Sequence, residues 1–160
     1  REHGGRAKYV HEMPGFTARL DAIQAAILRV KLRRLARANE RRRLAAARYR
    51  ARLAGVEGIR LAPEVRDGEE VHHLFVVQVD RRDAVRARLA EKGIQTGLHY
   101  PVPLHLQAAF AGCGAKPGDF PVAEAAARDG LSLPMYPELT DAQVARVCAA
   151  LREAVAAAAG

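Results

Sequence analysis

The sequence predicts an α+β fold with one long helix near its start, and three observations carry this prediction. Apolar residues recur at helical spacing between Pro14 and Leu53. The residues after Gly55 alternate in short elements, of which 72–79 is rich in β-branched and aromatic side chains. A strand, a helix and a second strand are expected in this order, with one more strand before the first. Such a unit forms a sheet that is covered by helices on one side. Such short elements need the long helix to pack against.

The long helix is expected to be buried on two sides in its first half. Pro14 and Gly15 signal a turn before it, and Gly55 ends it. Two apolar stripes imply a helix wedged between a domain core and another domain or subunit. These stripes consist of Leu20, Ile23, Ile27 and Val30, and of Leu28, Leu32 and Leu35.

The second half of this helix is strongly basic. Eleven of the 26 Lys and Arg lie between Arg29 and Arg52, against one acid, Glu40, and the net charge of the chain is +8. A basic run can bind nucleic acid or an acidic partner, or it can be a solvated outer face. Ala and Leu interleave at helical spacing, and aromatic residues for base stacking are scarce. The solvated face is therefore favoured, and we do not expect nucleic-acid binding.

Strands and helices alternate in the rest of the chain. Strands are expected at 59–62, 72–79, 95–100 and 131–135. Thr140 and Gln143 form a capping box for an amphipathic terminal helix that frays from Ala156. The other helices are expected between Asp80 as N-cap and Gly93, at 104–110, and from Asp119 to Gly130.

Composition places the chain among cytoplasmic proteins. Cys113 and Cys148 lack the spacing of a zinc or redox site, so free thiols are expected. No apolar run is long enough to span a bilayer, and no signal peptide is visible. The first residue is not Met, which suggests a piece of a longer protein.

The residues by themselves contain no complete catalytic motif. A phosphate loop, a nucleophile elbow and a zinc-binding histidine pair are all missing, so no metal is expected. The densest local chemistry is HYPVPLH, in which His99 and His105 flank Tyr100 and two prolines. This segment is either part of a site or a rigid exit from a strand, and the residues leave both readings open.

Five blocks in order resemble the DegT/DnrJ/StrS nucleotide-sugar aminotransferases. The blocks are GFTARLDAIQAAILRVKL, HHLFVV, GIQTGLHYPVPLHLQAAF, GDFPVAE and LSLPMYPELTDAQV, and the resemblance covers residues 3 to 155. It implies the C-terminal small domain of the aspartate-aminotransferase architecture, fold type I, with a long helix and a small, mainly antiparallel sheet flanked by helices. It further implies that 1–17 ends a large domain, that 18–54 is a dimer-facing helix, and that 55–160 is the small domain.

The resemblance also implies roles for four residues around pyridoxal 5'-phosphate (PLP). Thr17 stands where the family usually has an Asn that reaches the cofactor phosphate of the neighbouring subunit, and a hydroxyl can still donate there. Arg19 matches a family Arg suited to phosphate or carboxylate. His99 and Tyr100 match positions that line the sugar-nucleotide pocket. A helix-start salt bridge is the other reading of Arg19.

The catalytic Lys of the family lies upstream of residue 1, so this chain is expected to be inactive by itself. The full enzyme would be a homodimer that moves an amino group from an amino acid such as glutamate to a nucleotide-linked keto sugar. A binding module that uses the basic helix is the alternative from another class. A regulator of the same fold, or a dehydratase with His in place of the Lys, is a third.

Overall fold

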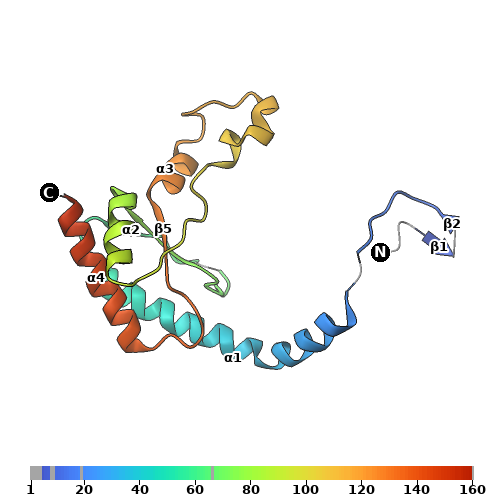
Figure 1. Cartoon of the computed structure of the whole chain (residues 1–160), viewed down its shortest axis with the longest axis horizontal. Helices are drawn as coiled ribbons and strands as arrows, with labels where there is room; N and C mark the ends of the chain where they lie inside the picture. Colours follow the sequence, from blue (N-terminus) through green and yellow to red (C-terminus); the bar gives the residue numbers. More distant parts are fainter. Residues whose placement is uncertain (1–4, 8–9, 19, 66, 160) are drawn as a thin grey trace. The chain divides into compact units, whose positions relative to one another are not determined.

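The computed structural model describes residues 5–7, 10–18, 20–65 and 67–159. The chain consists of two compact units, Arg1–Arg37 and Ala38–Gly160 (Figure 1). The first contains an antiparallel pair of very short strands, β1 (Gly5–Ala7) and β2 (Val10–His11). The long helix α1 (Ala22–Leu53) begins in the first unit and ends in the second.

Helix α1 begins at Ala22 because Asp21 caps it. The Asp21 Oδ1 atom accepts hydrogen bonds from the backbone N–H groups of Ile23, at 2.8 Å, and Gln24, at 3.1 Å. Both apolar stripes of its first half are exposed, as shown by Ile23 at 72% and Leu32 at 67%. The helix enters the hydrophobic core only at Ala45.

The second unit is built on a three-stranded antiparallel sheet in the order β3-β4-β5. These strands are β3 (Ile59–Leu61), β4 (Phe75–Val79) and β5 (Gly130–Leu133). Ile59 pairs with Val79, and Phe75 pairs with Leu133. At the other edge of β5, Gly97 and Ser132 form a single antiparallel bridge. The expected α+β fold with a small antiparallel sheet is confirmed.

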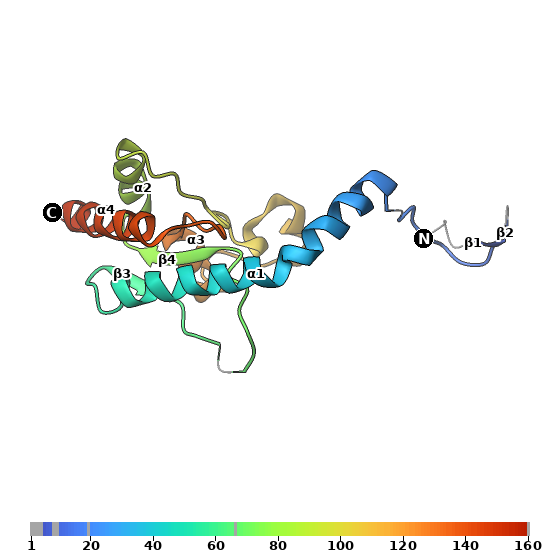
Figure 2. The same ribbon diagram turned by 90° about the horizontal axis from the view of Figure 1, so that it is seen from below.

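The core lies against one face of this sheet. Phe75, Val77 and Val79 alternate along β4 and are buried, and the Tyr49 ring of α1 stacks on Phe75 with 4.8 Å between centroids. Helices α2 (Arg82–Glu91) and α4 (Asp141–Ala159) pack side by side and complete the core (Figures 1 and 2). Helix α3 (Pro121–Asp129) contacts β4 and β5.

The segment between the Gly97 bridge and α3 contains two 3-10 helices, η1 (Leu104–Leu106) and η2 (Ala108–Cys113). They confirm the helical turns expected at 104–110. The capping box of α4 is confirmed as well. Thr140 Oγ1 accepts from the Gln143 N–H at 3.2 Å, and Gln143 Oε1 accepts from the Thr140 N–H at 2.9 Å.

Two of the expected strands are wrong in part. The strand expected at 72–79 begins only at Phe75. The Arg42 guanidinium donates to the carbonyls of His72 and His73, at 3.5 and 3.3 Å, and His72 has a φ of 52°, so these two residues cannot continue the strand. The strand expected at 95–100 is reduced to the Gly97 bridge. The chain leaves the sheet there, since the His99 ring folds back over Gly97.

The expected ends of two helices are also wrong. Asp80 does not cap α2, because its Oδ1 accepts from Arg60 Nη1 at 2.8 Å and Arg81 takes the cap position with a φ of 50°. Helix α4 does not fray at Ala156 but runs to Ala159. Arg81 and Arg88 donate to the carbonyls of Ala158 and Ala157, which holds the last turn.

Candidate functional site

The His99 imidazole is fixed by a serine at the edge of the sheet. His99 Nδ1 lies 2.9 Å from Ser132 Oγ. The two backbones are joined as well, since the Gly97 N–H donates to the Ser132 carbonyl at 3.0 Å and the Ser132 N–H donates to the Gly97 carbonyl at 2.9 Å. Backbone bridge and side-chain hydrogen bond together hold the imidazole beside β5.

The absence of a side chain at residue 97 makes room for this ring. A Cβ atom built on Gly97 would lie 2.6 Å from His99 Cε1, closer than real Cβ contacts allow. Any larger residue would therefore push the imidazole away from Ser132 or bend the backbone.

Tyr100 stands next to His99 and is open to solvent. Its exposed fraction is 76%, and its ring meets the His99 ring edge-on, with 5.5 Å between centroids and 70° between planes. The peptide bond between the two residues is cis. His99 and Tyr100, for which the family resemblance implies substrate binding, thus present an imidazole and a phenol side by side on one exposed segment.

A second imidazole fastens the segment that follows. His105 Nε2 lies 3.0 Å from Glu124 Oε1, which also accepts from the Gly118 N–H at 2.8 Å and the Phe120 N–H at 3.4 Å. The backbone N–H of Gly118, with help from His105 and Phe120, holds the pKa of Glu124 below its usual value. The His105 ring also packs on Phe120, with 4.8 Å between centroids. These contacts tie η1 to the start of α3, so His105 has a structural role here.

The two expected phosphate-binding residues belong to the first unit. Thr17 is exposed and precedes α1. Arg19 lies outside the described residues. The three described lysines, Lys31, Lys92 and Lys116, are exposed, so none offers the desolvated amine that a Schiff base with PLP needs.

Ser132 is the residue of this candidate site that sequence reasoning missed. It is the only serine of the chain. A single hydroxyl inside an apolar strand, between Leu131 and Leu133, was the signal that could have drawn attention to it. Its partner is 33 residues away in sequence, so the pairing itself is visible only in the structure.

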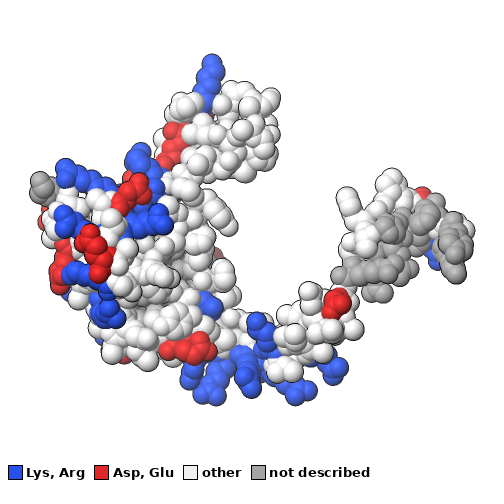
Figure 3. Space-filling view, in the orientation of Figure 1, with Lys and Arg blue, Asp and Glu red and all other residues white. Residues whose placement is uncertain are grey.

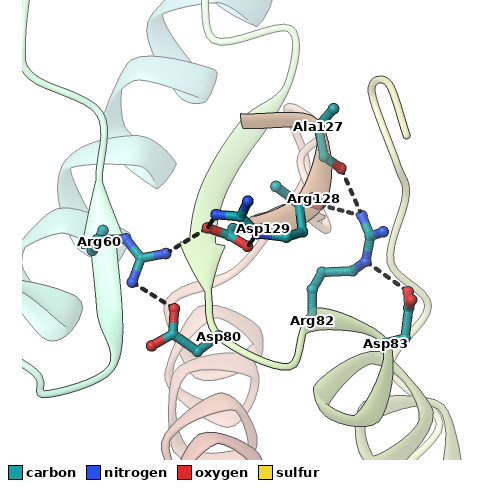
Figure 4. Close-up of polar contacts among 8 residues, drawn as sticks. Arg60, Asp80, Arg82, Asp83, Ala127, Arg128 and Asp129 are labelled. Carbon is teal, nitrogen blue, oxygen red and sulfur yellow. Dashed lines mark hydrogen bonds and ion pairs between the residues drawn. The ribbon is translucent and has the colours of Figure 1, made fainter. Parts of the chain in front are cut away.

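A second polar cluster lies where β3, β4 and α3 meet (Figure 4). The buried Asp129 carboxylate forms ion pairs with Arg60, at 3.0 Å, and with Arg128, at 2.8 Å. Arg60 also forms an ion pair with Asp80. Arg82 Nη1 donates to the Gly130 carbonyl at 3.0 Å, while its Nε lies 2.6 Å from Asp83 Oδ1 without the alignment of a hydrogen bond.

An open hollow of about 570 Å³ adjoins this cluster. Its charged side chains are three Arg and three Asp, namely Arg81, Arg82, Arg128, Asp80, Asp83 and Asp129. The charges balance, and each of the carboxylates pairs with an arginine of the cluster. We assign this network to the joining of strands and helices rather than to ligand binding.

Other kinds of site are not visible in the described part of the chain. Residues 5–7, 10–18, 20–65 and 67–159 contain no group of three His, Cys, Asp or Glu that could hold a metal ion. Among the helices described there, none combines the length and the apolar character needed to cross a membrane.

A long helix followed by a small antiparallel sheet with flanking helices is the architecture of the C-terminal part of fold type I aminotransferases. The chain belongs to the DegT/DnrJ/EryC1/StrS aminotransferase family, which it matches over residues 1–152. The resemblance inferred from the five sequence blocks is thereby confirmed.

Individual relatives agree with this assignment. The chain is 47% identical over 153 residues to the dTDP-3-amino-3,4,6-trideoxy-alpha-D-glucose transaminase of Streptomyces venezuelae, covering 96% of this chain and 40% of the relative. It is 45% identical to the erythromycin biosynthesis sensory transduction protein EryC1 of Saccharopolyspora erythraea, covering 95% of this chain and 42% of the relative. The chain thus spans about 40% of the length of these relatives.

Solved structures show the same fold. The crystal structure of S. venezuelae DesV superimposes with a TM-score of 0.90 at 47% identity and covers 96% of this chain and 41% of that chain. The PLP-form of the putative sugar aminotransferase Spr1654 from Streptococcus pneumoniae superimposes with a TM-score of 0.84 at 26% identity, covering 97% and 41% of the two chains.

Proposed function

We propose that this chain is the C-terminal part of a PLP-dependent aminotransferase that moves an amino group from an amino acid, such as glutamate, to a nucleotide-linked keto sugar. The observation that carries the proposal is the family match over residues 1–152, within which His99 and Tyr100 form an ordered, exposed pair. An imidazole and a phenol can hydrogen-bond to sugar hydroxyls and phosphate oxygens.

The division of the chain follows the same proposal. Residues 1–17 end the large domain, residues 18–54 link the domains and face the partner of a homodimer, and residues 55–160 form the small domain. The exposed apolar stripes of α1 support a partner surface, since contiguous exposed apolar area on a soluble protein marks an interaction site. The parent protein is proposed to act in the cytoplasm.

Each part of the chain then has its own task at the cofactor. When bound, PLP supplies the electron sink that makes amino transfer possible. Thr17 and Arg19 would hold the PLP phosphate across the dimer. The Thr17 hydroxyl would donate one hydrogen bond, and the Arg19 guanidinium could donate two in parallel. His99 and Tyr100 would bind and orient the sugar nucleotide. The lysine that anchors the cofactor lies outside this chain, so the chain alone is inactive.

The proposal is tested with the parent protein, meaning this chain together with the large domain that precedes it. The assay supplies PLP, glutamate and a dTDP-linked or UDP-linked keto sugar, and follows the amino sugar by mass spectrometry. We expect an amino sugar from the parent protein and none from residues 1–160 alone. Product formation by the isolated chain, or its absence with both nucleotides in the parent protein, would overturn the proposal.

The basic side of α1 is the observation behind the alternative function (Figure 3). Several of its arginines are already engaged, since Arg42 binds backbone carbonyls and Arg43 pairs with Glu40 and Glu69. We therefore propose a solvated face. Binding of duplex DNA at low salt that disappears in Arg33→Glu and Arg34→Glu would favour the alternative instead.

A further inference from the structure

The hydroxyl of Ser132 is buried and needs a hydrogen-bond acceptor. Ser132 is 4% exposed and lies on β5 between two buried leucines. Its own N–H and C=O are engaged with Gly97. Among the described residues, the one hydrogen bond of its side chain goes to His99 Nδ1, at 2.9 Å. Buried hydroxyl groups in proteins are paired almost without exception.

This contact can be made with the proton on either side, and the two arrangements differ in cost. If Nδ1 carried the ring proton and donated to Oγ, the buried Ser132 O–H would have no acceptor among the described residues. If the hydroxyl donates to a bare Nδ1, both groups are satisfied, and the neutral ring carries its proton on Nε2. The second arrangement is therefore favoured.

The Nε2 atom of the same ring is left for a ligand. It makes no hydrogen bond to the part of the chain that the structure describes, and His99 is exposed beside the exposed Tyr100. A ring locked in this tautomer presents an N–H, which can donate to an oxygen but cannot accept a proton from a substrate.

We propose that Ser132 is a positioning residue that holds His99 in the Nε2–H tautomer, so that His99 meets the substrate as a hydrogen-bond donor. The acceptor is an oxygen of the bound molecule, and the part of the inference that names a nucleotide-linked sugar rests on the function proposed above. Gly97 is part of the same arrangement, because a side chain at this position would keep the His99 ring from reaching Ser132.

The tautomer is measured by long-range ¹H–¹⁵N correlation NMR on the uniformly ¹⁵N-labelled chain at about pH 8.5, where an ordinary imidazole is neutral. The His99 signals are assigned by their loss in His99→Gln. We expect an unprotonated Nδ1 and a protonated Nε2 in the unmodified chain. Ser132→Ala should move the two ring nitrogen shifts toward each other, and Ser132→Thr, which keeps the hydroxyl, should restore them.

Two further variants keep the test decisive if Ser132→Ala disturbs the fold. Gly97→Ala displaces the ring without touching the hydroxyl and should likewise move the two ring nitrogen shifts toward each other. Gly112→Ala is the matched control, since a Cβ there meets nothing within 4 Å, and it should leave the His99 signals unchanged. A protonated Nδ1 in the unmodified chain, or an unchanged pattern in both Ser132→Ala and Gly97→Ala, would overturn the proposal.

The NMR result is independent of the amination assay, because it needs neither substrate nor cofactor. The proposed contact between His99 and the substrate is tested by measuring KM for the nucleotide-linked keto sugar in the parent enzyme. Loss of one neutral hydrogen-bond donor should raise KM about tenfold in Ser132→Ala and leave it near its original value in Ser132→Thr. An unchanged KM in Ser132→Ala would overturn this contact while the tautomer assignment stands.

Discussion

Tyr49 shows how one side chain joins the long helix to the sheet. Its ring is fully buried against Phe75, and its hydroxyl donates to the Pro134 carbonyl at 2.9 Å, 85 residues further along the chain. Tyr49→Phe should destabilise the chain by about 1 kcal/mol, because it leaves the partly buried Pro134 carbonyl without its donor. Urea unfolding measures the change. Tyr100→Phe, at an exposed position, is the control and should have little effect.

The same residue predicts a dependence on alkaline pH. Burial raises the pKa of Tyr49 well above its ordinary value, so the folded state favours the neutral phenol. The contribution of this residue is complete below about pH 10, where unfolded tyrosines begin to ionise, and it is lost as the pH rises. The difference in urea midpoint between the unmodified chain and Tyr49→Phe should shrink above that pH. A constant difference up to pH 11 would contradict the burial of the phenol.

At the scale of elements, Glu124 fastens the η1 segment to α3 and predicts an effect at acidic pH. Backbone N–H groups and His105 lower the pKa of Glu124, so its stabilising contribution is present above about pH 4.3 and is lost as the pH falls through the lowered value. Glu124→Gln should remove this part of the acid dependence. The measurement is amide hydrogen exchange at Gly118 between pH 3 and 5.

The control for this prediction is Glu138→Gln. Glu138 is exposed and forms no ion pair with the residues that the structure describes. It should leave exchange at Gly118 unchanged. Equal exchange in the unmodified chain and in Glu124→Gln at every pH would show that the carboxylate does not hold the segment.

The elements that sequence patterns predicted well are those with local causes. The alternation along 75–79 is visible within five residues, and the capping box of α4 lies within four, from Thr140 to Gln143. The errors have distant causes. Arg42 binds the carbonyl of His72, 30 residues away in the sequence, and so shortens the strand that follows; it also binds the carbonyl of Met135, 93 residues away. Arg60 binds the Asp80 carboxylate, which therefore does not cap α2. The candidate site divides in the same way, since HYPVPLH is visible in the sequence and its contact with Ser132 is not.

At the scale of the whole molecule, the first half of α1 predicts self-association. Its apolar side chains are exposed, with Ile27 at 55% and Val30 at 55%, and the proposed function assigns this face to the large domain and a dimer partner. We expect the chain to form dimers or larger species in sedimentation velocity runs, and Ile27→Glu to reduce them. Val122→Glu, at an apolar residue that is 83% exposed on α3, is the control and should not. A chain that stays monomeric at high concentration would contradict the assignment.

We propose that this chain belongs to a PLP enzyme whose anchoring lysine lies outside residues 1–160. The described lysines are exposed, and family membership rests on the match over residues 1–152. The direct test treats the parent protein with PLP, reduces it with borohydride and maps the adduct by mass spectrometry. One stoichiometric adduct at a lysine outside residues 1–160 is the predicted result. A stoichiometric adduct at Lys31, Lys92 or Lys116, or no adduct anywhere in the parent protein, would contradict the claim.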